Sequence, residues 1–114
     1  MTGELSFFEL GTGDYDRARA FYSELFGWEF EATDGGGRIS TPTVPGGIHP
    51  NDAGASPYVF FAVDDLDAAL AKVRDLGGSG DSMDEDPGTV AEFGRFALCK
   101  DDQGSSFGLH QRPA

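Results

Sequence analysis

The chain has 114 residues, of which 39% are hydrophobic and 12% aromatic, so it can fold as one domain with its own core. Twenty acidic residues against eight basic ones give a formal net charge of −12. Such a chain repels polyanions, which argues against nucleic acid and anionic membrane surfaces as partners.

Cysteine content and the N-terminal sequence indicate the cellular compartment. Cys99 is the single cysteine, which excludes an intramolecular disulfide and a thiolate metal cluster within one chain. The first ten residues, MTGELSFFEL, have no basic segment followed by a long apolar run, and no apolar run approaches membrane-spanning length. A cytoplasmic, soluble protein is therefore expected.

The first half of the chain predicts a strand, a helix and further strands. Residues 5–11 are typical of a strand, and apolar residues at helical spacing predict a helix over about 14–26. Asp14 can cap the start of this helix with its carboxylate, and Gly27 can end it in a left-handed conformation. The apolar residues on one face of the helix are Ala18, Phe21, Tyr22, Leu25 and Phe26. Strands are expected at 28–32, 38–43 and 44–49, with a hairpin turn at 34–37.

The second half predicts the same order of elements after a turn-rich linker at 50–57. An apolar strand at 58–63 precedes a helix that begins at Asp65 and is closed by Gly77 and Gly78. Its predicted buried face carries Leu66, Ala69, Leu70, Val73 and Leu76. The remaining expected elements are an acidic loop at 81–88 and strands at 92–100 and 105–111.

An internal repeat connects the two halves. When the chain is shifted by 51 residues, six of fourteen positions from Asp14 to Gly27 are identical to their counterparts, including Asp14 with Asp65. A shift of 61 residues pairs Gly47-Ile48-His49 with Gly108-Leu109-His110. The sequence therefore predicts an α+β fold with two βαβββ modules, about 4–50 and 57–111, in a single domain spanning 1–114.

This layout resembles the vicinal oxygen chelate superfamily, which includes glyoxalases, bleomycin resistance proteins and extradiol dioxygenases. The segments that carry the resemblance are Asp14 to Trp28, Val63 to Ala69, Leu76 to Gly78, Gly94 to Phe96 and Asp101 to Leu109. The resemblance implies two modules whose curved mixed sheets form open cups, and a homodimer.

The resemblance also implies where a metal would bind. Metal-using members of the superfamily hold a divalent ion with four side chains, usually His or Gln in the first strand and Glu in the last strand of each module. The matching positions here are Phe7, Tyr58, Gly47 and Gly108. These residues cannot coordinate a divalent ion in the family's way, so a member without a metal cofactor is expected.

The leading hypothesis is a protein that binds a small aromatic or hydrophobic molecule and is non-catalytic or metal-independent. Its cup would be lined by Phe7, Tyr58, Phe60 and Phe107, with Trp28 near the rim and Glu9 as a polar anchor. Gly47 and Gly108 would leave volume where other members carry metal-binding carboxylates. Aromatic walls with few polar groups suit a planar ligand.

Two alternatives remain open at the level of sequence. His49 and His110, together with Glu9 or Glu92, could form a displaced site for one divalent ion such as Ni, Zn, Fe or Mn. The protein would then be a lyase, isomerase or dioxygenase. The other alternative is a structural or protein-interaction role.

Overall fold

The computed structural model describes residues 3–83 and 86–114, and the chain divides into two compact units. One unit is Phe7–Val59. The other combines Phe60–Ala114 with the described residues up to Ser6. The second unit is therefore assembled from both ends of the chain.

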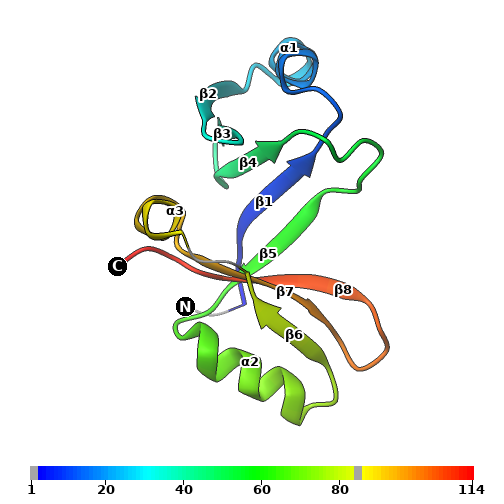
Figure 1. Ribbon diagram of the computed structural model, residues 1–114, viewed down its shortest axis with the longest axis vertical. Coiled ribbons are helices and arrows are strands. Elements are labelled where there is room, and N and C mark those ends of the chain that lie inside the picture. The colour runs from blue at the N-terminus through cyan, green and yellow to red at the C-terminus, as the bar shows by residue number, and fades with distance from the viewer. Residues whose placement is uncertain (1–2, 84–85) are drawn as a thin grey trace. The chain divides into compact units, whose positions relative to one another are not determined.

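The Phe7–Val59 unit contains one helix and four strands, with most of β1 belonging to it (Figure 1). The elements are β1 (Leu5–Gly11), α1 (Tyr15–Phe26), β2 (Glu29–Thr33), β3 (Gly36–Ser40) and β4 (Gly46–His49). The strand order is β2-β3-β4-β1, with β1 and β4 parallel and the other pairs antiparallel. This mixed sheet confirms the predicted βαβββ order.

The ends of α1 are set by local chemistry, as predicted. The carboxylate of Asp14 accepts a hydrogen bond from the Arg17 backbone N–H at 2.9 Å, and Gly27 ends the helix with φ of 75°. The core under the helix consists of Leu10, Ile39 and Ile48. Helix residues Tyr15, Ala18 and Tyr22 pack against this core.

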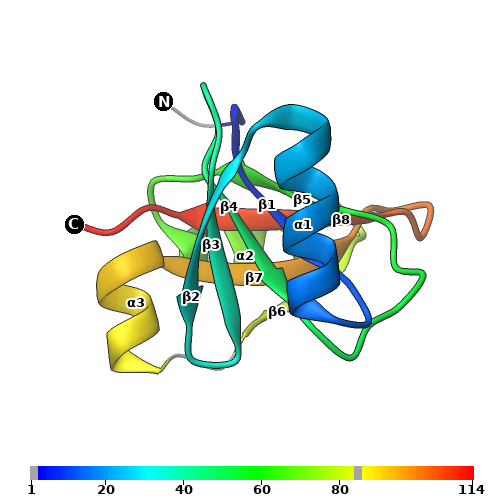
Figure 2. The same cartoon turned by 90° about the horizontal axis from the view of Figure 1, so that it is seen from above.

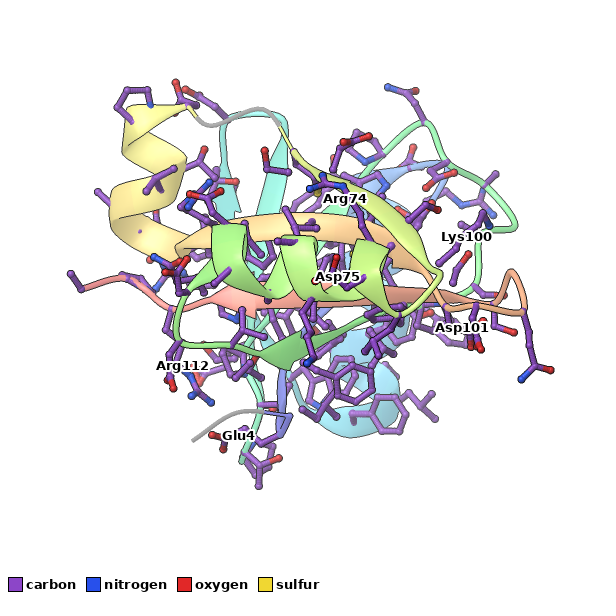
Figure 3. All side chains as sticks on the ribbon, turned by 90° about the horizontal axis from the view of Figure 1, so that it is seen from below. Glu4, Arg74, Asp75, Lys100, Asp101 and Arg112 are labelled. Atoms are coloured by element: carbon purple, nitrogen blue, oxygen red, sulfur yellow. The ribbon has the colours of Figure 1, made fainter. Side chains whose placement is uncertain are left out.

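Within its described residues, the second unit contains two helices and four strands, with most of β5 belonging to it. The elements are β5 (Tyr58–Ala62), α2 (Leu66–Asp75), β6 (Ser79–Ser82), α3 (Pro87–Phe93), β7 (Arg95–Lys100) and β8 (Ser106–Gln111). The strand order is β5-β8-β7-β6, and β5 pairs with β8 in parallel. Figure 3 looks onto α2, with β7 and β8 behind it. The core beneath α2 consists of Leu66, Leu70, Ala97, Cys99 and Leu109.

The sequence analysis did not predict strand β6 or helix α3. Asp86 caps it by accepting from the Thr89 backbone N–H at 3.1 Å, Pro87 occupies its first turn, and Gly94 ends it with φ of 96°. Figure 2 shows the helix leading directly into β7. The strand expected from residue 92 therefore starts only at Arg95. The prediction of an acidic loop at 81–88 is wrong at both ends, because β6 extends to Ser82 and α3 begins at Pro87. Residues 84–85 of the predicted loop lie outside the described residues.

The architecture confirms the predicted α+β class, with α3 as an insertion in the second βαβββ sequence. Among the described residues, no helix is both long enough and apolar enough to cross a membrane.

Candidate functional site

Glu9 and His49 lie on the sheet face that points away from α1. In the parallel pair of β1 with β4, Glu9 is opposite Gly47, and Gly11 is opposite His49. The intervening residues Leu10 and Ile48 belong to the core that α1 covers. Because side chains alternate along a strand, Glu9 and His49 project from the other face of the same two strands.

Four side chains form a continuous hydrogen-bond network on this face, which we call the Glu9–Tyr58 network. The His49 Nδ1 atom lies 2.6 Å from Glu9 Oε2, and the His49 Nε2 atom lies 2.8 Å from Asp52 Oδ2. The Tyr58 hydroxyl donates to the same Asp52 oxygen at 2.8 Å. All four residues belong to the Phe7–Val59 unit.

Each contact of the His49 ring with a carboxyl group needs one proton. Asp52 accepts from Tyr58, and its lowered pKa favours the ionised carboxylate, so His49 donates to it from Nε2. The contact between His49 Nδ1 and Glu9 requires a second proton, carried by the ring or by the carboxyl group. Both contacts are satisfied when His49 is protonated, and the raised pKa of His49 favours that form.

Two glycines and one turn make room for the acidic side chains. A Cβ atom on Gly47 would overlap the carboxylate of Glu9, and one on Gly11 would overlap the carboxylate of Asp52. Asp52 follows Asn51, whose φ of 61° turns the chain. The backbone N–H of Asp52 donates to the Thr12 carbonyl at 2.8 Å. Backbone conformation thus brings both carboxylates to the imidazole.

The groups of the network shift one another's protonation. Burial raises the pKa of Glu9, although the hydrogen bond to His49 opposes the shift. Partial burial works to lower the pKa of His49, but the hydrogen bonds to Glu9 and Asp52 outweigh it, and the pKa is raised. The hydrogen bonds from His49 and Tyr58 lower the pKa of Asp52, and the bond to Asp52 raises the pKa of Tyr58.

The network is accessible as well as ordered. The side chains of His49 and Asp52 are each 34% exposed, and that of Glu9 is 25% exposed. The His49 and Tyr58 rings lie side by side, with centroids 5.9 Å apart. A hydrogen-bonding group in solution can therefore reach a prearranged set of acceptors and donors next to an aromatic ring.

His110, the counterpart of His49 in the repeat, is part of the interior instead. It is 3% exposed, its Nδ1 atom lies 2.9 Å from Ser6 Oγ, and its Nε2 atom lies 2.7 Å from the Phe93 carbonyl. The ring stacks on Phe96 with centroids 4.5 Å apart. Burial lowers the pKa of His110, which favours a neutral, structural imidazole.

The residues of the alternative metal site do not fit a divalent ion. Both ring nitrogens of His49 and of His110 are hydrogen-bonded, and Glu92 lies on α3 rather than on a strand. Within residues 3–83 and 86–114, no group of three or more His, Cys, Asp or Glu residues is arranged to hold a metal ion.

The predicted ligand-binding residues do not all lie on one face of the sheet. Phe7 and Glu9 both approach Gly47, on the face away from α1. Trp28 packs on the opposite face, with the core under α1. Phe107 packs with the core under α2, whereas its neighbour Gly108 lies against Phe60 on the other face of that sheet.

The expected volume beside the two glycines is not present. The carboxylate of Glu9 occupies the space next to Gly47, and the ring of Phe60 occupies the space next to Gly108. Asp52 was not predicted as a site residue, because residues 50–57 look like a linker. The signal available was the Pro50-Asn51-Asp52 sequence directly after His49, since Asn tolerates a positive φ that turns the chain back.

Residues 4–109 match the family model described as the Glyoxalase/Bleomycin resistance protein/Dioxygenase superfamily. A "Glyoxylase-like domain-containing protein" of Didymella fabae is 33% identical over 91 residues, which cover 68% of this chain and 71% of that protein. A Mycobacterium bovis protein named as a candidate glyoxylase, CFP32, is 33% identical over 122 residues. That match covers 96% of this chain but 46% of the relative, so the chain spans less than half of the mycobacterial protein.

A solved structure shares the fold. Methylmalonyl-CoA epimerase from Mycobacterium tuberculosis aligns over 97% of this chain and 88% of its own, with a TM-score of 0.68 and 20% identity. At this identity the likeness concerns the fold, and activity has to be argued from the site itself.

Proposed function

Because the chain belongs to the Glyoxalase/Bleomycin resistance protein/Dioxygenase superfamily, we propose that it binds a small organic molecule at the Glu9–Tyr58 network. The observation that carries this proposal is a partly exposed network of four side chains, held together by hydrogen bonds of 2.6 to 2.8 Å. Prearranged polar groups of this kind fix the orientation of a ligand. Binding requires no metal ion in this proposal.

The chemistry of the network favours one class of ligand. Two carboxylates, Glu9 and Asp52, flank a single imidazole, and the chain carries a net charge of −12. A protonated amine therefore meets a favourable field and can donate to Glu9 in place of His49. The adjacent Tyr58 ring supplies apolar contact area, so we propose an aromatic or hydrophobic amine as the ligand.

The contact between Glu9 and His49 favours a second candidate function. A proton held between Glu9 and His49 can be delivered to a bound substrate or replaced by one taken from it, which is general acid–base catalysis. The protein would then be an isomerase or lyase that moves a proton with its own side chains. Turnover of a bound compound, followed by NMR in deuterated water, separates this candidate from simple binding.

The first proposal is tested by screening aromatic amines against their uncharged isosteres, with backbone amide NMR spectra as the readout. We expect the amines to shift resonances of β1, β4 and residues 50–58, and Glu9→Gln to weaken binding at least tenfold. Glu29→Gln, which removes an exposed carboxylate from the same sheet, is the matched control and should leave binding unchanged. Binding that maps elsewhere, or that is equal in both variants, contradicts the proposal.

A further inference from the structure

A cationic side chain lies beside the Glu9–Tyr58 network on the same face of the sheet. Arg38 of β3 is opposite Gly47 of β4, and Gly47 is in turn opposite Glu9 of β1. The residue that follows Arg38, Ile39, is fully buried in the core that α1 covers. Because side chains alternate along a strand, Arg38 projects from the other face, which is the one that carries Glu9.

Gly47 brings the two charged groups within one strand of each other. It has no side chain, and the carboxylate of Glu9 lies over it, where a Cβ atom would stand. Neighbouring strands are about 5 Å apart, so this carboxylate lies one strand spacing from the backbone of Arg38. The face therefore presents a negative group and a positive group side by side.

Arg38 is suited to hold an anionic group. The residue is half-buried, and its Nε atom is shielded from solvent, which strengthens the attraction between the guanidinium and an anion. Glu31, which lies opposite Arg38 on β2, is exposed, and ion pairs with exposed carboxylates are weak. A guanidinium has five N–H donors, so Arg38 can bind a carboxylate while other donors serve other partners.

The charges of the site balance when Arg38 is included. The two carboxylates of the network and a protonated His49 carry one net negative charge, and the guanidinium of Arg38 offsets it. A ligand with an ammonium group alone brings an unbalanced positive charge next to Arg38. A ligand that carries a carboxylate beside its ammonium group does not.

We propose that Arg38 binds a carboxylate of the ligand, so that the site takes an aromatic or hydrophobic α-amino acid. This inference rests on the proposed function, because Glu9 holds the ammonium group as in the amine proposal. An α-amino acid carries its two charged groups on one carbon atom, which matches a negative and a positive side chain on neighbouring strands. Its side chain can then lie against the Tyr58 ring beside His49.

Three ligands that differ by one charged group test this proposal by isothermal titration calorimetry. Phenylalanine has both charges, phenethylamine lacks the carboxylate, and 3-phenylpropionate lacks the ammonium group. We expect phenylalanine to bind the wild-type chain at least tenfold more tightly than either of the others, because the bonds to Glu9 and Arg38 form together. Backbone amide NMR spectra should show the shifted resonances in β1, β3 and β4.

Variants of Arg38 test which residue holds the carboxylate. Arg38→Gln should abolish the preference for phenylalanine over phenethylamine. Arg38→Lys keeps the charge but loses the paired N–H geometry, so it should retain part of the preference. Arg19→Gln removes a positive charge from the exposed side of α1 and is the matched control, which should retain the full preference. Amide spectra show that each variant is folded.

The outcomes separate the carboxylate subsite from the amine site. If phenethylamine binds at the network and phenylalanine binds no more tightly, the amine site stands and the carboxylate subsite is refuted. A preference for phenylalanine that survives Arg38→Gln refutes the role of Arg38. If none of the three ligands binds, both proposals fail.

Discussion

The two glycines at equivalent positions of the repeat should respond differently when a methyl group is added. In Gly47→Ala the new Cβ atom overlaps the Glu9 carboxylate and lies 3.3 Å from Phe7 Cζ. The end of the Glu9 side chain can rotate away, so the fold accommodates the methyl group. Glu9 then loses its hydrogen bond to His49, and the pKa of His49 falls towards its ordinary value.

The magnitude follows from two opposing contributions. A hydrogen bond between charged groups contributes about 1.5–3 kcal/mol, and the partial exposure of both side chains keeps it near 1.5. Gly47 does not have a positive φ, so alanine recovers about 0.5–1 kcal/mol by restricting the unfolded chain. The net loss in free energy of unfolding is about 0.5–1 kcal/mol.

The loss should depend on pH in a defined direction. Since the folded pKa of His49 is raised, its contribution is fully present below the unfolded value of about 6.5 and disappears as pH rises through the folded value. Urea unfolding should therefore show the variant less stable than wild type by about 0.5–1 kcal/mol near pH 6. Near pH 9, where the hydrogen-bond contribution is lost, the variant should be more stable by about 0.5–1 kcal/mol through the alanine contribution alone. The pKa of His49 is measured by NMR titration of its ring resonances.

Gly108→Ala is the matched comparison in the other unit. There the added Cβ meets the ring of Phe60, which is 4% exposed and cannot rotate into solvent. The cost is that of overpacking, about 1–3 kcal/mol, and the pKa of His49 should not change. An unchanged His49 pKa in Gly47→Ala, or equal pH dependence in both alanine variants, would refute the reasoning.

Three further predictions concern other parts of the chain. His110→Ala should lower the free energy of unfolding by about 2–4 kcal/mol, because the buried ring and its two hydrogen bonds are lost. The folded pKa of His110 is lowered, so the wild type should lose stability as pH falls below about 6.5, and the variant should not show this loss. Urea unfolding at two pH values checks this, and an unchanged pH dependence of stability contradicts it. Tyr58→Phe should raise the pKa of Asp52, measured by carboxyl NMR titration, because a donor to Asp52 is lost; no change would show that His49 alone sets this pKa. Asp14→Ala should cost about 1 kcal/mol by removing the cap of α1, while Asp14→Asn should cost less; equal losses contradict the capping role.

Features encoded by neighbouring residues were predictable from the sequence. Helices α1 and α2 begin at capping aspartates and carry apolar residues at helical spacing, and both lie where expected. Helix α3 had comparable signals in Asp86, Pro87 and Gly94, but the surrounding acidic residues favoured a loop. Short helices of this kind lack the repeated apolar pattern that identifies longer ones.

The candidate site could not be predicted from local sequence, because it is formed by residues that are far apart in the chain. Glu9 and His49 meet because β1 and β4 pair in parallel with one particular register, which brings together residues 40 positions apart. Asp52 joins them through a backbone turn with a positive φ. The prediction that Phe107 and Gly108 line the same site could have been rejected from the sequence. The two residues are adjacent in a strand, so they point to opposite faces of the sheet.

The buried His110 ring has a consequence for synthesis of the chain. It joins the Ser6 side chain to the Phe93 carbonyl, and the Ser6 contact spans 104 positions. Phe7–Val59 is continuous in sequence, so it can fold as soon as it leaves the ribosome. The other unit cannot close until His110 has emerged, so Ser6 must wait for a partner that is made 104 residues later.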